Sequence, residues 1–141
     1  MTTLSPLSAA VAELKAAGTV TAITSRIRAV EPAPGDALGA GHYLPFVVLS
    51  QLDAPWQAGT ATAEVVIGVR AYGVTFDQAE ALCLACLAVF HRRGPRIAAS
   101  RLGIYSSHAN GGPTLDKDPD TSQPVAYGLV TLNASIQSIP T

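Results

Sequence analysis

"ATAEVVIGVRAYGVTFDQAEALCLACLAVFHRRGP", residues 61–95, holds the two patterns that decide the fold. In its first part apolar side chains alternate with others, which predicts a half-buried strand over residues 61–73. Thr75 and Gln78 then form a capping box, and apolar residues follow at intervals of three and four. These features predict a helix over residues 76–92, which the following Gly-Pro pair ends.

Shorter patterns on both sides of this stretch predict one more helix and four more strands. The helix is expected over residues 6–17, and the strands over residues 23–30, 44–53, 97–107 and 125–137. Gly18 is a natural end for the first helix. The order α-β-β-β-α-β-β predicts a single α+β domain over residues 1–141, with a mainly antiparallel sheet and two helices packed on one face.

Two segments between these elements are rich in Pro, Gly and Asp, and we expect them to be long loops: residues 31–43 and residues 107–124. Loops as long as the first are unusual inside a compact domain and tend to serve a function or to be disordered. Pro45 opens the apolar run that follows. Because proline cannot donate a ladder hydrogen bond, it belongs at the start of a strand or on an edge strand.

The overall composition favours a protein that buries surface against partners. Charged residues make up 13% of the 141 residues, about half the usual share, and the formal net charge is −1. This balance gives no field that would attract nucleic acid, and no apolar run approaches the roughly 20 residues of a membrane helix. The N-terminus lacks the basic and apolar regions of a secretory signal, so we expect a cytoplasmic protein.

Two motifs resemble metal or redox sites, and a structural role explains each of them better. Cys83 and Cys86 form a CxxC pair on the apolar stripe of the second predicted helix. A redox pair gains reactivity at a helix N-terminus and a zinc site needs two further ligands, so we expect two small core cysteines. Residues 116–120 resemble the first half of a calcium loop but lack the glycine and the glutamate that it requires, which indicates a solvated acidic turn.

The three histidines give no sign of a catalytic site. His42, His91 and His108 are scattered over predicted loops and a helix end. A nucleophilic site needs a serine or cysteine in a defined turn with a base beside it, and no such motif is present. Phosphate-binding and metalloprotease motifs are also missing. The sequence therefore predicts a protein that is not an enzyme and uses no metal and no cofactor.

Two clusters of opposite charge stand apart in the sequence, one at the end of the second helix and one in the second loop. Cations at a helix C-terminus are stabilised by about 0.3–1 kcal/mol through the helix dipole, which explains the first cluster as well as partner binding does. Subunits that join head to tail need two different, complementary surfaces, so we take both clusters as candidate subunit or tube interfaces. The basic cluster is Arg92, Arg93 and Arg96, and the acidic turn is Asp116, Asp118 and Asp120.

Three segments carry a resemblance to a known family. They are "LPFVVL" at residues 44–49, "TFDQAEAL" at residues 75–82 and "DKDPDTSQPVAYGLVTLNAS" at residues 116–135. In this order, behind an N-terminal helix and a short strand, they resemble the tail-terminator or tail-completion proteins of long-tailed bacteriophages. The similarity extends over roughly residues 5–136. It implies an α+β subunit that assembles into a six-membered ring, without catalysis and without a cofactor.

The resemblance also implies the partners and the location. Rings of this family sit on the last ring of the tail tube, stop its growth, and offer a surface to the neck or connector protein, while DNA passes through the central hole. We therefore expect a protein of the virion tail, assembled in the cytoplasm of a bacterial host. The loop 31–43 would contact a neighbouring subunit or the tube and become ordered on assembly. Pro32 and Pro34 would lower the entropy that this ordering costs.

Three alternatives remain open at the level of the sequence. The first is another structural protein of the same virion, such as a neck or head-completion protein. The second is a small-molecule-binding α+β module, which would have an enclosed pocket and a defined monomer or dimer. The third is a hydrolase or redox protein that uses Cys83 and Cys86 or the histidines.

Overall fold

The computed structural model of this protein describes residues 6–29, 45–53, 62–97, 103–119 and 122–135. Three helices and six strands lie within these residues. They are α1 (Pro6–Ala16), α2 (Gly18–Thr21), β1 (Ile27–Arg28), β2 (Phe46–Asp53), β3 (Thr62–Tyr72), α3 (Phe76–Phe90), β4 (Arg96–Ile97), β5 (Gly103–Lys117) and β6 (Pro124–Ser135). The strands form one sheet in the order β1-β2-β3-β6-β5-β4, so the predicted α+β class is confirmed.

The sheet is mixed, which corrects the expectation of a mainly antiparallel sheet in one respect. β2, β3, β6, β5 and β4 pair antiparallel in turn, but β1 pairs parallel with β2. Parallel neighbours need a connection of a dozen or more residues, and the sequence between β1 and β2 is long enough to provide one. The length of the segment 31–43 is therefore a requirement of this topology.

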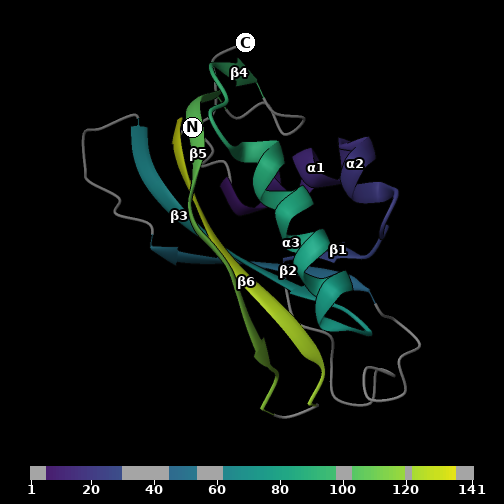
Figure 1. The fold of residues 1–141 in the computed structure, drawn as a ribbon. Helices are drawn as coiled ribbons and strands as arrows, with labels where there is room; N and C mark the ends of the chain where they lie inside the picture. Colours follow the sequence, from purple (N-terminus) through teal and green to yellow (C-terminus); the bar gives the residue numbers. More distant parts are fainter. Residues whose placement is uncertain (1–5, 30–44, 54–61, 98–102, 120–121, 136–141) are drawn as a thin grey trace.

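All three helices cover one face of the sheet (Figure 1). Helix α3 buries one stripe of side chains against β3 and β6, where Ile67, Val69 and Val130 are fully buried. Ala10 and Leu14 of α1 belong to the same core. The stripe of α3 consists of Ala79, Leu82, Cys83, Cys86, Leu87 and Phe90, which the periodicity of the sequence predicts together with Phe76. Phe76, in the first turn, is exposed instead.

The start of α3 follows the predicted capping box with one change. The Thr75 hydroxyl accepts a hydrogen bond from the Gln78 backbone N–H at 3.2 Å. The Gln78 side chain reaches back, but it accepts from the Val74 N–H at 2.8 Å, one residue before the cap. The first contact satisfies a backbone donor that the start of a helix leaves without a partner, and the second binds the donor of the residue before the cap.

The ends of the helices differ from the prediction. Gly18 does not simply end the first helix, because it begins the short α2 after a break at Ala17. The described residues therefore contain three helices, where the sequence predicted two. Helix α3 ends at Phe90, two residues before the predicted end, and Arg92 has a positive φ of 52°. A residue in this left-handed conformation takes the chain out of the helical path.

The predicted loop over residues 107–124 is the largest error of the sequence analysis. Strand β5 continues to Lys117 and β6 begins at Pro124, so only the turn between them remains. Gly, Pro and Asp in this stretch indicated a loop, but pairing with the apolar strand β6 overrides that local preference. The ladder accommodates the irregular residues by register shifts around Gly111.

At the edge of the sheet formed by β1 and β2, β1 is shorter than predicted and β2 begins later than predicted. β1 covers only Ile27–Arg28 of the predicted residues 23–30, and the Thr24 hydroxyl before it donates to the Pro45 carbonyl at 2.6 Å. Pro45 directly precedes the first residue of β2. This agrees with one of the two positions predicted for it, the start of a strand. β2 is not a full edge strand, because β1 pairs with its first residues.

Candidate functional site

The basic cluster is bound mostly within the subunit. Arg96 binds the Glu13 carboxylate of α1 with two nitrogens, Nε to Oε2 at 2.6 Å and Nη2 to Oε1 at 3.0 Å. Arg93 adds a third contact from Nη1 to Oε2 at 2.8 Å. The side chains of Glu13 and Arg96 are only 9% and 12% exposed, whereas that of Arg93 is 47% exposed. This arrangement ties α1 to the C-terminal end of α3 and to β4.

A hydrogen-bond chain extends this cluster into the sheet. Arg96 Nη2 donates to the Ser107 hydroxyl at 2.9 Å, and Ser107 donates to the Phe90 carbonyl at 2.8 Å. The last carbonyl groups of a helix lack partners inside it, so Ser107 satisfies one of them. Arg93 and Arg96 therefore have a structural role. Glu13, which no pattern in the sequence singled out, reveals this role because both arginines bind its carboxylate.

Arg92 differs from its two neighbours. It is exposed and, within the described part of the chain, contacts no acidic side chain. Of the three predicted interface arginines, only Arg92 thus keeps its whole charge available to a partner. Its position beside the Glu13 cluster makes it the natural residue for separating partner binding from subunit stability.

The acidic turn lies where β5 passes into β6. Asp118 accepts a hydrogen bond from the Tyr72 hydroxyl at 3.1 Å, and its backbone closes the turn with Gln123 and Ser122 at 2.9 and 2.8 Å. Asp116 accepts from the backbone N–H of Lys117 at 2.7 Å. Asp118 therefore shapes the turn, while Asp116 is exposed on the last residues of the strand.

The structure does not bring the two charge clusters together within one subunit. Arg96 pairs with Ile104 at the start of β5, and Asp116 lies twelve residues farther along the same strand. At roughly 3.3 Å per residue, the clusters lie up to about 40 Å apart, at opposite ends of the strand (Figure 1). The remaining predicted interface residues, Asp120, Pro32 and Pro34, fall outside the described residues.

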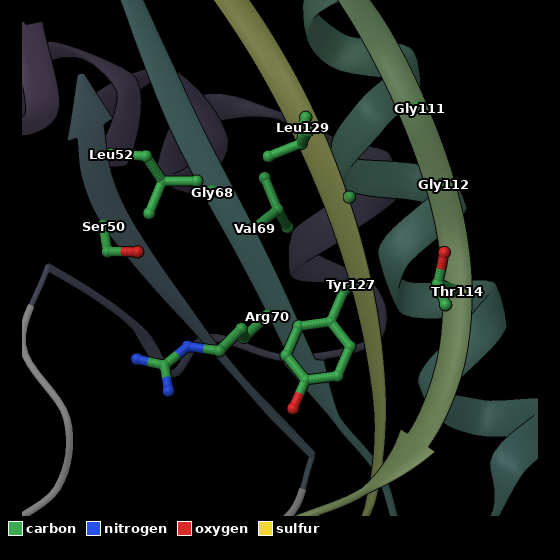
Figure 2. A pocket seen from close by; sticks show the side chains of 11 residues that line it. Ser50, Leu52, Gly68, Val69, Arg70, Gly111, Gly112, Thr114, Tyr127 and Leu129 are labelled. Atoms are coloured by element: carbon green, nitrogen blue, oxygen red, sulfur yellow. The ribbon is translucent and has the colours of Figure 1, made fainter.

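The face of the sheet without helices, called here the open face, carries a hollow that sequence reasoning missed. It has a volume of about 600 Å³ and extends from β2 across β3 and β6 to β5. Leu52 and Leu129 border it with exposed fractions of 59% and 40%, and Arg70 and Tyr127 lie at its other end (Figure 2). The surface is therefore mainly apolar with a few polar groups at one end.

Glycines create this hollow. Gly68 lies in the middle of β3, where a Cβ would approach Leu52 Cδ1 to 3.0 Å. Gly112 has a φ of 106°, and a Cβ there would lie 2.5 Å from the carbonyl oxygen of Tyr127. Glycine inside a strand marks a bulge or a close approach of another group, so Gly68 and the Gly111-Gly112 pair were the signal in the sequence.

The other end of the open face is filled by its own side chains. The rings of Phe46 and Tyr72 stack with centroids 4.4 Å apart and an angle of 11° between their planes. Val48 and Val125 are buried with them. The hollow thus begins where this second apolar cluster ends.

The two cysteines are core residues, as predicted. Cys83 and Cys86 are free thiols, fully buried under α3. Burial raises the pKa of Cys83 to about 11, and burial together with the charge of Cys83 raises the pKa of Cys86 to about 12. Nucleophilic cysteines need a lowered pKa and access to solvent, so this pair has the opposite properties.

The two histidines that the structure describes do not form a site together. His91 Nδ1 accepts a hydrogen bond from the Ala109 backbone N–H at 3.2 Å, and His108 is exposed on β5. His42 lies outside the described residues. Over the described ranges, no three His, Cys, Asp or Glu side chains come together as metal ligands would. None of the described helices combines the length and the apolar surface that crossing a membrane requires.

Comparison with known proteins gives a structural neighbour. No protein-family model matches the chain, and no curated protein matches it. Among solved structures, a chain of the "Virion of native gene transfer agent (GTA) particle" has a similar fold, with a TM-score of 0.61 and 17% sequence identity. The likeness covers 92% of this chain and 94% of the other, so the two share their fold over nearly their whole lengths.

Proposed function

We propose that this protein is a structural component of a phage-like virion and that it forms the ring which caps the tail tube. The observation that carries the proposal is the fold shared over nearly the whole length with a chain of a gene transfer agent virion. The tail-terminator resemblance of the sequence supports the same conclusion from an independent direction. In this role the ring ends tail elongation and presents its other surface to the neck or connector protein.

The proposed assembly is a ring of six identical subunits around a hole through which DNA passes. The low charged fraction of 13% and the exposed apolar side chains of the open face fit a subunit that buries surface on assembly. The role needs no catalysis and no cofactor. The segment 31–43, with Pro32 and Pro34, is proposed to contact the tube or a neighbouring subunit.

Electron microscopy of the purified protein, alone and mixed with tail tubes, tests this function. We expect annular particles, and we expect them at one end of each tube. Binding along the side of the tubes, or at the neck of assembled heads only, would contradict the tail cap and favour a neck or head-completion protein. A variant in which a Gly/Ser linker of the same length replaces residues 31–43 keeps the connection between β1 and β2 and should cap tubes less well. Unchanged capping would remove the side chains of that segment from the interface.

One observation favours a second candidate function, the binding of a small apolar molecule. The hollow of about 600 Å³ has the size of a ligand pocket and combines apolar walls with Arg70 and Tyr127 at one end. This reading requires a monomer or dimer whose melting temperature rises when an apolar ligand is added. A ring that shows no such shift with a panel of apolar and aromatic acids would exclude it.

A further inference from the structure

The outer edge of β2 is only partly covered. β1 pairs with Val47 and Val48, and the Val47 N–H donates to the Arg26 carbonyl at 2.9 Å. Backbone groups of alternate residues point to the same side of a strand, so those of Gln51 also point toward the β1 side. β1 ends before it reaches Gln51, and among the described residues no other strand pairs there.

The outer edge of β5 is also covered only at its beginning. β4 pairs with Ile104, Arg93 bridges to Ser107, and the N–H of Ala109 donates to His91. From residue 110 to Lys117 no strand among those described pairs with this side. As far as the described strands go, the edge is therefore open over its second half.

The orientation of one residue on this edge follows from the neighbouring strand. The Pro124 carbonyl accepts from Gly73, so Pro124 and, by alternation, Ala126 point toward β3. Leu115 lies opposite Ala126 in the register of β5 and β6. Its backbone N–H and carbonyl consequently point away from β6, toward the open side.

The two open edges run antiparallel to each other and lie on opposite sides of one row of the sheet. Gln51 pairs with Ile67, Ile67 with Val130, and Val130 with Ala109, so both openings begin in this row. From it the β2 opening extends to the level of His108, whereas the β5 opening extends the other way, past the level of Val47. Three successive antiparallel pairings separate β2 from β5, which makes these two strands antiparallel. A neighbouring copy in a ring would therefore place its β2 antiparallel to β5 of the first copy, and the two openings meet only if the copies are also shifted along the strands.

We propose that neighbouring copies of this chain join by antiparallel pairing of the β2 edge from Gln51 onward with the β5 edge from residue 110 to Lys117. An unpaired edge is a template for another strand, and two different edges give the head-to-tail contact that a closed ring needs. This inference rests on the proposed ring and names the surfaces that join it. Leu115 lies level with Val47, four residues before Gln51, so pairing Gln51 with residues near Leu115 requires a shift of this size along the strands. A stagger between strands is what the closure of a sheet requires.

Proline substitutions test the pairing because they remove single donors. Gln51→Pro and Leu115→Pro each remove an N–H that points outward, and they leave the ladders to β3 and β6 their own donors. We expect each variant to keep the wild-type circular dichroism spectrum and to form at least tenfold fewer rings, counted by electron microscopy and native mass spectrometry. Ser50→Pro is the matched control, because the Ser50 N–H points toward β3 and its loss should lower the melting temperature instead.

Disulfide cross-linking tests the same pairing without removing a hydrogen bond. Gln51→Cys is combined in turn with cysteine at Asn110, Thr114, Leu115 or Asp116, and the native thiols stay silent because they are buried. Oxidation should give a ladder of cross-linked species up to the closed ring for at least one of these pairs. Gln51→Cys with Glu80→Cys on the exposed side of α3 is the control and should give no ladder.

The outcomes separate this inference from the function on which it rests. Rings that persist in a folded Gln51→Pro variant, or rings that give no ladder with any of the four pairs, would overturn the edge pairing and leave the tail cap standing. If the proline variants do not fold, the cross-links decide. Wild-type protein that gives no annular particles, either alone or on tubes, would overturn both.

Discussion

The two faces of this sheet show how one set of strands serves two purposes. On the covered face, Ile67 and Val69 of β3 and Val130 of β6 are fully buried under α3. On the open face the same strands present Gly68 and an exposed Leu129, and the surface is hollow. Side chains alternate between the faces of a strand, so the two surfaces can differ residue by residue. At the level of the hollow, stability should therefore reside on the covered face and binding on the open face.

The largest expected effect is a contrast between two leucines. Leu82→Ala removes a fully buried side chain of α3 and should lower the free energy of unfolding by about 2–5 kcal/mol, because it leaves a cavity. Leu129→Ala on the open face should change it by about 0.5 kcal/mol or less. Urea denaturation of both variants measures the difference. Equal costs would show that the open face is packed in solution, which would contradict its role as a binding surface.

The buried thiols of the covered face should make stability depend on pH in the alkaline range. Their pKa values are raised to about 11 and about 12, above the value of 9.0 for a free thiol. Above pH 9 the unfolded chain therefore loses protons that the folded chain keeps, so stability is complete below pH 9 and falls as pH rises toward 11–12. At about 1.4 kcal/mol per thiol and pH unit, the loss from the two thiols should reach roughly 3 kcal/mol by pH 10.

The matched comparison for this prediction is the double variant Cys83→Ala/Cys86→Ala. It lacks both groups, so its free energy of unfolding should change less between pH 7 and pH 10 than that of the wild type. Urea unfolding at the two pH values measures both proteins. If the free energy of unfolding falls equally with pH in the wild type and in the double variant, the thiols are not buried as the structure shows them.

A substitution of Glu13 tests how much the contact between α1 and the end of α3 contributes to stability. Glu13→Gln keeps the size of the side chain but leaves Arg96 beside a neutral amide. Losing one partner of a buried pair costs about 3–5 kcal/mol, and the exposure of Arg93 reduces this to an expected 1–2 kcal/mol. Glu80→Gln, an exposed position on α3, is the control and should be neutral in a thermal melt. Equal melting temperatures of the two variants would show that the Glu13 cluster contributes nothing to stability.

The sequence predicted what local patterns encode. Helix α3, its capping threonine and the buried cysteines follow from periodicity and from the residues at the helix start, and the structure confirms them. The strand β3 was also found nearly to its ends, because its alternation continues over its whole length.

What the sequence did not reveal depends on contacts between distant residues. Residues 108–117 read as a loop, and only the neighbouring strand β6 makes them a strand. The basic cluster read as a free surface because Glu13 lies about eighty positions earlier in the chain, and no local pattern connects the two. The hollow arises from glycines on two strands that become neighbours only through the order β3-β6-β5.

The smallest expected effect separates Arg92 from Arg93. Arg92→Glu reverses a charge without touching Glu13, so the stability of the subunit should not change. If Arg92 meets an acidic group of a neighbour, such as Asp116, the reversal should weaken ring assembly about two- to fivefold, since exposed pairs contribute about 0.2–1 kcal/mol. The effect should diminish in high salt, because such pairs are screened beyond about 8–10 Å at physiological ionic strength.

The double reversal of Arg92 and Arg93 completes this comparison. Arg93→Glu places a carboxylate beside Glu13, so it should lower the melting temperature of the subunit as well as ring assembly, whereas Arg92→Glu should affect assembly alone. Sedimentation velocity at increasing salt and a thermal melt measure the two effects separately. If assembly is unchanged in the double variant, both arginines act only at the helix end, and the joining of subunits depends on the sheet edges.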